Sequence, residues 1–310
     1  MTGTDHDPAI PQSRAPGFRS GVVALIGRPN VGKSTLLNRL VGQKIAIVTP
    51  APQTTRSRLQ GVLTLPRAQI VFVDTPGMHA PRHRLGSRMV ELSRAAVNDA
   101  DVVLWIIDAA VPATPDDALV AAVLRSARPP VVLALNKVDR LSTGRQPVPP
   151  ADVGLPPLAA VVPLSAAAGT GVDRLIATLV GLLPEGPQYF PPEMVTDQQE
   201  RELVREFIRE QAILLTREEV PYGIAVEIEE FAPRAGTGLI YIRAVVLVEQ
   251  ESHRKIVVGR GGRVLKEIGG RARRQIESLL GSRVYLDLWV KVAKDWRSKD
   301  AMIRRLYSSS

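Results

Sequence analysis

Residues 27–34, Gly-Arg-Pro-Asn-Val-Gly-Lys-Ser, constrain the fold more than any other stretch, because they fit the pattern G-x-x-x-x-G-K-[ST]. The apolar run 22–26 before them predicts a buried strand, and the helical spacing of 34–40 after them predicts a helix. Glycines let such a loop curl so that backbone N–H groups and the helix N-terminus surround a phosphate. Lys33 would then reach the β- and γ-phosphates of a nucleotide, and Ser34 would bind Mg²⁺.

Strand-like and helix-like segments alternate from residue 21 to about residue 183. The apolar runs that predict strands lie near 21–26, 69–73, 101–107, 130–135 and 160–164, and 59–65 is a candidate for an additional edge strand. Near-continuous Val, Ile and Leu indicate strands that are covered on both faces. This part of the chain therefore predicts an α/β domain with a mostly parallel sheet flanked by helices.

A segment rich in proline and glycine, 184–192, ends this alternation, because helices and strands cannot continue through it. Beyond it, the pattern predicts helices at 200–216 and 263–280 and strands at 224–231, 239–248 and 284–292, a small α+β domain. We therefore divide the chain into a flexible N-terminal tail (1–20), a first domain (21–183), a linker (184–198), a second domain (199–305) and a C-terminal tail (306–310).

The excess of positive charge lies entirely in the last fifth of the chain. Residues 252–310 contain 15 Lys and Arg against 5 Asp and Glu, whereas residues 1–251 contain 25 against 26. A local excess of this size favours a polyanionic partner. The chain has no cysteine, which excludes disulfides, thiolate metal sites and cysteine nucleophiles. No apolar run reaches the ~18 residues of a membrane span, so we expect a cytoplasmic protein.

An acidic residue should follow the next strand if the first loop binds a nucleotide with its Mg²⁺. The run 71–77, Val-Phe-Val-Asp-Thr-Pro-Gly, meets this expectation. Asp74 would hold the metal through water, and the Gly77 N–H would sense the γ-phosphate. This turn lies where parallel strands end, which is where α/β domains bind their ligands.

The base is indicated by Asn136-Lys-Val-Asp139, which directly follows a predicted strand. The Asp139 carboxylate can accept two hydrogen bonds from the N1–H and 2-amino edge of guanine, whereas adenine offers neither donor. A further segment, Ser165-Ala-Ala, follows another strand and would present backbone N–H groups to the guanine O6. Together these segments predict a guanine nucleotide, GTP or GDP.

These motifs, in this order, resemble those of the Ras-like GTPases, and residues 48–56, Val-Thr-Pro-Ala-Pro-Gln-Thr-Thr-Arg, resemble the switch I region of the Era branch. In such GTPases a switch I threonine binds Mg²⁺ only when the γ-phosphate is present, and Thr54 and Thr55 are both candidates. The expected metal ligands are Ser34, Thr54, Thr55 and Asp74, and the expected catalytic residues are Lys33, Thr54, Thr55 and Gly77. The expected nucleotide-binding residues are Gly27, Arg28, Pro29, Asn30, Val31, Gly32, Lys33, Ser34, Thr35, Asp74, Thr75, Pro76, Gly77, Asn136, Lys137, Asp139, Ser165, Ala166 and Ala167.

Met78 departs from the Ras-like pattern, because a glutamine at this position would orient the attacking water. We therefore expect slow intrinsic hydrolysis unless another group positions the water. Similar GTPases use a K⁺ ion held by the asparagine of the phosphate loop, which here is Asn30. His79 and His83 are expected to face solvent rather than to act as general bases.

The basic segment contains a G-x-x-G loop, Gly259-Arg-Gly-Gly262, between two predicted helices. Small glycines let a nucleic-acid backbone approach closely, and a KH domain clamps about four nucleotides with such a loop. The expected RNA-binding residues are Arg254, Lys255, Gly259, Arg260, Gly261, Gly262, Arg263 and Lys266. Trp289 and Trp296 lie outside this loop, and we expect both to pack in the interior.

Residues 253–269, 272–277 and 284–297 resemble the C-terminal KH domain of the Era GTPases, so the resemblance covers about residues 20–305. It implies a P-loop GTPase domain followed by a type II KH domain of the α+β class. It also implies a monomeric GTPase that binds the 3′ end of 16S rRNA, assists maturation of the 30S ribosomal subunit and has a peripheral inner-membrane fraction in some members. The alternatives are an ATP-using P-loop enzyme and an RNA-binding protein with an inactive nucleotide pocket.

Overall fold

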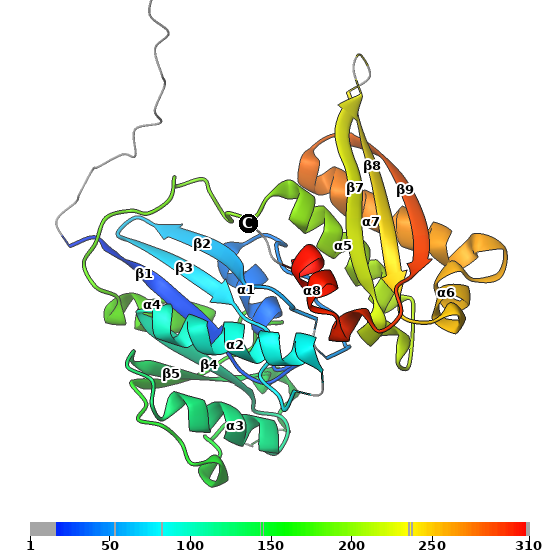
Figure 1. Ribbon diagram of the computed structural model, residues 1–310. Helices are drawn as coiled ribbons and strands as arrows, with labels where there is room; N and C mark the ends of the chain where they lie inside the picture. Colours follow the sequence, from blue (N-terminus) through cyan, green and yellow to red (C-terminus); the bar gives the residue numbers. More distant parts are fainter. Residues whose placement is uncertain are drawn as a thin grey trace, which may run out of the picture.

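The computed structural model of the protein describes residues 17–307 except 53, 82, 143, 145, 235 and 237. Two sheets divide the molecule into two domains that lie side by side (Figure 1). Among the described residues no helix is both long and apolar enough to span a bilayer.

The first domain is built on a six-stranded sheet in the order β2-β3-β1-β4-β5-β6. Its strands are β1 (Arg19–Ile26), β2 (Leu59–Leu65), β3 (Ala68–Asp74), β4 (Val102–Asp108), β5 (Val131–Asn136) and β6 (Ala160–Pro163). All pairs are parallel except β2 with β3, so the predicted mostly parallel sheet is confirmed, and the candidate strand 59–65 is an edge strand that runs antiparallel to β3.

Helices cover both faces of this sheet. They are α1 (Lys33–Val41), α2 (Arg84–Asp99), α3 (Pro115–Leu124) and α4 (Val172–Leu182), with short 3₁₀ turns at Val138–Arg140 and Ala151–Val153. One apolar core joins α1 and α4 to one face, and a second joins α2 and α3 to the other. Because β1, β3, β4, β5 and β6 are parallel, their carboxyl ends meet at one edge of the sheet and position the candidate site there.

The second domain has a three-stranded sheet in the order β7-β8-β9, with β8 and β9 parallel. Its elements are α5 (Glu200–Leu214), a 3₁₀ turn (Val220–Gly223), β7 (Ala225–Arg234), β8 (Leu239–Val248), α6 (Glu251–Val258), a 3₁₀ turn (Arg260–Gly262), α7 (Arg263–Leu280), β9 (Arg283–Val292), a 3₁₀ turn (Trp296–Ser298) and α8 (Asp300–Tyr307). An apolar core joins α5, α6 and α7 to one face of the sheet.

The linker is fastened to the first domain along much of its length. The Gln69 side chain donates to Phe190 O at 2.8 Å and accepts from the N–H groups of Tyr189 and Phe190. Further on, Val62 N donates to Val195 O at 2.9 Å, and Thr196 Oγ1 donates to Gln60 O at 2.7 Å. The buried Gln69 amide thus binds the linker to the sheet.

Both terminal tails were predicted to be longer than they are. Arg19 and Ser20 belong to β1, and residues 1–16 lie outside the described part of the chain. At the other end, Leu306 and Tyr307 belong to α8 and are buried in a core that also contains Leu85 of α2. Residues 308–310 lie outside the described part. Figure 1 shows α8 between the two domains.

The two tryptophans of the C-terminal region differ in environment. Trp296 is fully buried and its Nε1 donates to Gly223 O at 2.8 Å, which confirms the predicted packing role. The same prediction is wrong for Trp289, which is 57% exposed. Trp289 shares a strand face with Tyr285 and Lys291, away from the core formed with α7, and strand alternation alone does not reveal that this face is uncovered.

Candidate nucleotide site and nucleic-acid interface

The phosphate loop connects β1 to α1 through a backbone that only glycine allows at two points. Gly32 has φ +101°, and a Cβ there would lie 2.4 Å from Asn136 Nδ2. A Cβ at Gly27 would lie 2.4 Å from Ile106 O. The loop is thus pressed against β4 and β5, and its glycines are needed for close approach as well as for the turn.

Lys33 is buried at the start of α1, with its Nζ donating to Gly27 O at 3.1 Å and to Arg28 O at 3.0 Å. Burial lowers the pKa of Lys33 to about 8, although the nearby Asp74 opposes this shift. A phosphate in the loop would offer oxygens of full negative charge in place of these carbonyls. The Nζ position therefore suits contact with a phosphate.

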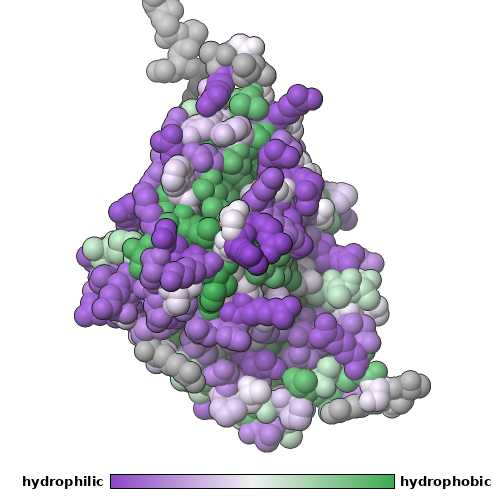
Figure 2. Space-filling view, turned by 90° about the vertical axis from the view of Figure 1, so that its right-hand side faces the viewer, coloured by the Kyte–Doolittle hydropathy of each residue, from purple (hydrophilic) through white to green (hydrophobic). Residues whose placement is uncertain are grey.

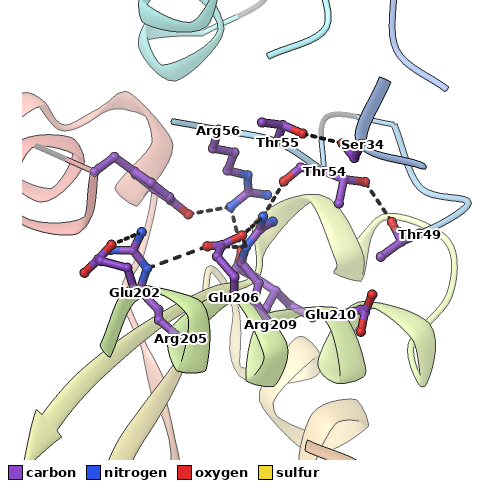
Figure 3. Close-up of polar contacts among 12 residues, drawn as sticks. Ser34, Thr49, Thr54, Thr55, Arg56, Glu202, Arg205, Glu206, Arg209 and Glu210 are labelled. Atoms are coloured by element: carbon purple, nitrogen blue, oxygen red, sulfur yellow. Dashed lines mark hydrogen bonds and ion pairs between the residues drawn. The ribbon is translucent and has the colours of Figure 1, made fainter. Parts of the chain in front are cut away.

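Three side chains converge beside the loop, and they distinguish Thr55 from Thr54. Ser34 Oγ lies 2.8 Å from Asp74 Oδ2 and 3.1 Å from Thr55 Oγ1, and Thr55 Oγ1 lies 3.2 Å from the same carboxylate oxygen. Thr54 Oγ1 instead lies 2.8 Å from Thr49 Oγ1 and donates to Ala51 O. Figure 3 shows Thr55 joined to Ser34 and Thr54 joined to Thr49. The geometry therefore favours Thr55 as the partner of Ser34 and Asp74.

The oxygen atoms of this cluster fit Mg²⁺. Asp74 is fully buried, and its Oδ1 accepts no hydrogen bond from the described residues. Burial raises the pKa of Asp74, and a cation would reverse that shift. The described residues contain no group of three or more His, Asp or Glu that could hold a metal. A hard cation here would use one carboxylate, hydroxyls and the oxygens of a nucleotide.

Asn136 and Lys137 connect the loops of the site. Asn136 Nδ2 donates to Val31 O at 2.7 Å, and Asn136 Oδ1 accepts from Ala166 N at 2.9 Å. Lys137 Nζ donates to Asn30 O and forms an ion pair with Asp108 Oδ2, both at 2.7 Å. The Asp108 partner was missed from the sequence, although an acid at the end of a strand was a usable signal.

The base-recognition residues lie at the margin of the cavity. A cavity of about 450 Å³ is lined by Pro29, Asn30, Gly32, Lys33, Ser34, Thr35, Ile47, Val48, Thr49, Pro50, Thr54, Thr55, Gly77, Lys137 and Arg140. Asp139 and residues 165–167 are not part of this lining. Asp139 is exposed and makes no hydrogen bond or ion pair with the described residues. Since Asn136 engages the Ala166 N–H, the Ala167 N–H is the one left to donate in this segment.

The turn after β3 touches the phosphate loop directly. A Cβ at Gly77 would lie 2.7 Å from Pro29 N, and Met78 N donates to Gly27 O at 3.1 Å. The Met78 side chain is fully buried in the core under α2. It therefore faces away from any attacking water, as well as lacking a polar group to orient one.

The two loop histidines are not simply solvent-facing, so that expectation is wrong. His79 is buried, with Nδ1 2.9 Å from Gly77 O. His83 caps α2 by accepting from Gly86 N, and its Nε2 lies 3.4 Å from Arg297 Nη1. Burial and the neighbouring Arg297 lower the pKa of His83. Both histidines are bound into the structure.

Switch I lies against the second domain, which the sequence did not reveal. Arg56 is buried and donates to Ile224 O at 2.7 Å, Tyr222 O at 2.9 Å and the Tyr307 hydroxyl at 3.0 Å. Its guanidinium also lies 5.5 Å from the centre of the Trp296 ring. Arg56 is adjacent to Thr55, so one short segment contacts both the Asp74 cluster and the second domain.

Helix α5 forms the other side of this contact. Figure 3 shows the charged residues of α5 beneath switch I. Arg209 donates to Thr54 O and forms an ion pair with Glu206, and Glu210 Oε1 accepts from Val48 N at 2.9 Å. Both Arg209 and Glu210 are buried. Burial of charge is tolerated here because each group has several polar partners.

The G-x-x-G loop is exposed at the junction of α6 and α7. Gly259, Gly261 and Gly262 have φ of +70°, +62° and +78°. A Cβ at Gly259 would lie 2.5 Å from a methyl of Val264. The predicted RNA-binding cations are all exposed around this turn, namely Arg254, Lys255, Arg260, Arg263 and Lys266.

Apolar surface lies near this loop and was also missed from the sequence. Ile256 of α6 is 47% exposed and Val292 of β9 is 41% exposed, and α6 packs against β9. Figure 2 views the molecule from the side of α6 and β9, and hydrophobic surface runs down it between hydrophilic flanks. Such residues resemble core positions in a sequence, but here they can contact nucleic-acid bases.

Two family models match the chain. One is described as a 50S ribosome-binding GTPase and matches residues 22–137, and the other is a KH domain and matches residues 219–297. The chain is 46% identical to GTPase Era of Halothermothrix orenii over 293 residues, which is 93% of this chain and 98% of that protein. It is also 46% identical to GTPase Era of Carboxydothermus hydrogenoformans, covering 93% of this chain and 97% of that protein.

Two solved structures resemble the whole molecule. One is a variant of Era from Aquifex aeolicus bound to GDP·AlF₄⁻, with a TM-score of 0.86, 41% identity and coverage of 93% of this chain and 99% of that chain. The other is Era in complex with MgGDPNP and nucleotides 1506–1542 of 16S ribosomal RNA, with a TM-score of 0.87, 41% identity and coverage of 93% and 98%. The likeness includes both domains.

Proposed function

Because this chain belongs to the Era family of GTPases, we propose that it is a GTP-hydrolysing ribosome assembly factor that binds the 3′ end of 16S rRNA and assists maturation of the 30S subunit. The observation that best supports this proposal is a contact between the two domains. Switch I lies between the phosphate loop and the domain that contains the G-x-x-G loop. The 16S rRNA segment in the related Era complex supports the choice of RNA.

In the proposed reaction Lys33 stabilises the charge on the β- and γ-phosphates, and the loop N–H groups hold them in place. Ser34, Thr55 and Asp74 would hold Mg²⁺, with Thr55 as a ligand only when the γ-phosphate is present. The metal, when bound, would neutralise charge that develops on the phosphates. Asn136 fixes the loops, Asp139 binds the guanine N1–H and 2-amino groups, and the Ala167 N–H donates to O6.

A group other than residue 78 positions the attacking water, since Met78 is buried and apolar. We propose that K⁺ held by Asn30 assists this step. Asn30 is exposed and lines the cavity, and its Oδ1 accepts no hydrogen bond from the described residues. Intrinsic hydrolysis is therefore slow, and the Gly77 N–H contributes by contacting the γ-phosphate.

On the RNA side, the exposed loop at Gly259–Gly262 clamps the nucleic-acid backbone, and Arg254, Lys255, Arg260, Arg263 and Lys266 contact phosphates. Thr55 contacts Ser34 and Asp74 in this structure, and Mg²⁺ with GTP would hold it there. Holding Thr55 would also fix the adjacent Arg56 and its contacts with Tyr222, Ile224 and Tyr307. The nucleotide state thereby alters how the KH domain meets RNA. The protein acts as a monomer in the cytoplasm, and any membrane contact is peripheral.

A direct test combines hydrolysis with RNA binding. Purified protein should hydrolyse GTP and prefer it strongly over ATP, and Lys33→Ala should lower the rate by about 10²–10³-fold. The Lys33→Ala variant is the control that distinguishes an active GTPase from an RNA-binding protein with an inactive nucleotide pocket. RNA captured by crosslinking with a GTP analogue should contain the 3′ end of 16S rRNA and should diminish with GDP. RNA capture that is indifferent to the nucleotide would overturn the switch.

A further inference from the structure

A second groove lies between the two domains, with none of its lining residues shared with the nucleotide cavity. Its volume is about 490 Å³, and it is lined by the segment after α1 together with parts of α5 and α7. The lining includes Lys44 from the first domain and Arg271, Arg274 and Gln275 from α7. No residue of this groove belongs to the nucleotide site or to the G-x-x-G loop.

The groove is positively charged at its rim. The Lys44 side chain is 39% exposed, and Arg271 and Arg274 are exposed on α7. Arg271 forms an ion pair with Glu267, whereas Arg274 makes no hydrogen bond or ion pair with the described residues. Cations contributed by two domains, with one guanidinium unpaired, fit the phosphates of a polyanion.

Helix α7 connects this groove to the G-x-x-G loop. The loop ends where α7 begins, at Arg263, and Arg274 lies eleven positions further on, or about 16 Å along the axis. Arg271 lies between them, eight positions after Arg263 and three before Arg274, so these three arginines share one side of the helix. A KH loop clamps only about four nucleotides, so a longer RNA must continue across neighbouring surface.

We propose that RNA held at the G-x-x-G loop continues along α7, and that its phosphate backbone enters this groove and contacts Arg274, Arg271 and Lys44. This inference rests on the proposed RNA-binding function and adds a second contact that includes the first domain. Because the contacts are from cations to phosphates, the groove accepts RNA without regard to sequence.

The groove also adjoins switch I. Lys44 Nζ lies 2.5 Å from Glu210 Oε2, and Glu210 Oε1 accepts from Val48 N at 2.9 Å. Gln211 and Gln275 both donate to Glu210 Oε2 at 3.2 Å, so this carboxylate keeps partners when Lys44 turns to a phosphate. RNA in the groove thus competes for Lys44 with Glu210, the carboxylate that contacts the start of switch I.

The test compares two adjacent arginines of α7. Arg274 lines the groove, whereas Arg273 is equally exposed but lines a different surface with Glu277 and Tyr285. Binding is measured for a short RNA that covers only the KH loop and for one equivalent to nucleotides 1506–1542 of 16S rRNA. Arg274→Ala should weaken the long RNA several-fold and reduce its salt slope by about 0.7–0.9, the value of one phosphate contact. Arg273→Ala should not change the binding of either RNA, and Arg274→Ala should not change the binding of the short RNA.

Lys44→Gln provides a second variant from the other domain, because its amide can still donate to Glu210. It should weaken the long RNA and spare the short one. The proposal is overturned if Arg274→Ala and Arg273→Ala behave alike on the long RNA while the short RNA binds normally. It is also overturned if Arg274→Ala instead weakens only binding to phosphatidylglycerol vesicles. If the unaltered protein binds neither RNA, the proposed function itself fails.

Discussion

The nucleotide site and the G-x-x-G loop are both glycine-rich turns before a helix, yet they are built in opposite ways. The first is enclosed by contacts between residues far apart in the chain, such as Asn136 with Val31, and its Lys33 and Asp74 are buried. The second is a local turn whose charges are exposed. Enclosure strengthens electrostatic interactions on a reacting phosphate, whereas exposed cations bind a long polyanion with an affinity that depends on salt.

Lys33→Ala should have the largest effect on one region, the nucleotide site, while leaving the other, the RNA-binding loop, unaffected. We expect the hydrolysis loss given above, of about 10²–10³-fold, because the other cation of the loop, Arg28, is paired with Asp117 and cannot replace the Lys33 ammonium. Binding of the short RNA in the absence of nucleotide should be unchanged, as measured by fluorescence anisotropy. A parallel loss of RNA binding would contradict the independence of the two sites.

Arg56 is the residue whose loss should uncouple the RNA-binding domain from the nucleotide state. Arg56→Ala leaves Tyr222 O and Ile224 O without their donor, at a cost of about 1–3 kcal/mol for each buried group. Thermal unfolding should show the destabilisation, and RNA affinity should become equal with GTP analogue and GDP. Arg58→Ala is the matched control, because Arg58 pairs with Asp99 inside the first domain. If RNA affinity still differs between GTP analogue and GDP in Arg56→Ala, the Arg56 contacts do not couple the nucleotide state to RNA binding.

The exposed loop can be altered without touching the enclosed site. Arg260→Asp combined with Gly261→Asp removes one positive charge and adds two negative charges, so RNA affinity should fall by about tenfold or more at physiological salt. Asp tolerates the positive φ of Gly261 better than most residues. Hydrolysis measured without RNA should remain at the level of the unaltered protein, and a change there would refute the separation.

The enclosed site should respond to pH where the exposed cations do not. Lys33 has a pKa of about 8 in the nucleotide-free protein, and a bound phosphate raises it, so nucleotide binding takes up a proton above that pH. Affinity for GDP should be level below pH 8 and fall by up to about tenfold per pH unit above it. Titration calorimetry between pH 7 and 9 can measure this. Lys33→Arg should remove the slope, because arginine stays protonated.

The smallest effect is expected from the monovalent cation. Replacing K⁺ with Na⁺ should slow hydrolysis a few-fold if K⁺ at Asn30 assists the reaction. Asn30→Gly removes the amide but keeps the φ of +63° accessible, and it should abolish the difference between the ions. Equal rates in both salts with the unaltered protein would remove K⁺ from the mechanism. RNA affinity should depend on the total ionic strength and not on whether the cation is K⁺ or Na⁺.

The features that could be predicted from the sequence are those set by local pattern, and the features that could not are those set by contacts between distant residues. The glycine loops, the strand ends and the helix at 263–280 are determined by local pattern, so they were placed within three residues. The choice between Thr54 and Thr55 depends on which hydroxyl faces Asp74, and no local pattern contains that information. The contacts of Arg56 join residues more than 160 positions apart, and the burial of His79 and exposure of Trp289 depend on which elements cover them.

The fastening of the linker to the first domain sets how far the KH domain can travel. The last linker contact is at Thr196 and α5 begins at Glu200, so only residues 197–199 are unattached, a span of about 10 Å when extended. So short a tether permits pivoting but not long-range delivery of RNA. It also keeps the effective concentration of one domain beside the other in the millimolar range or above.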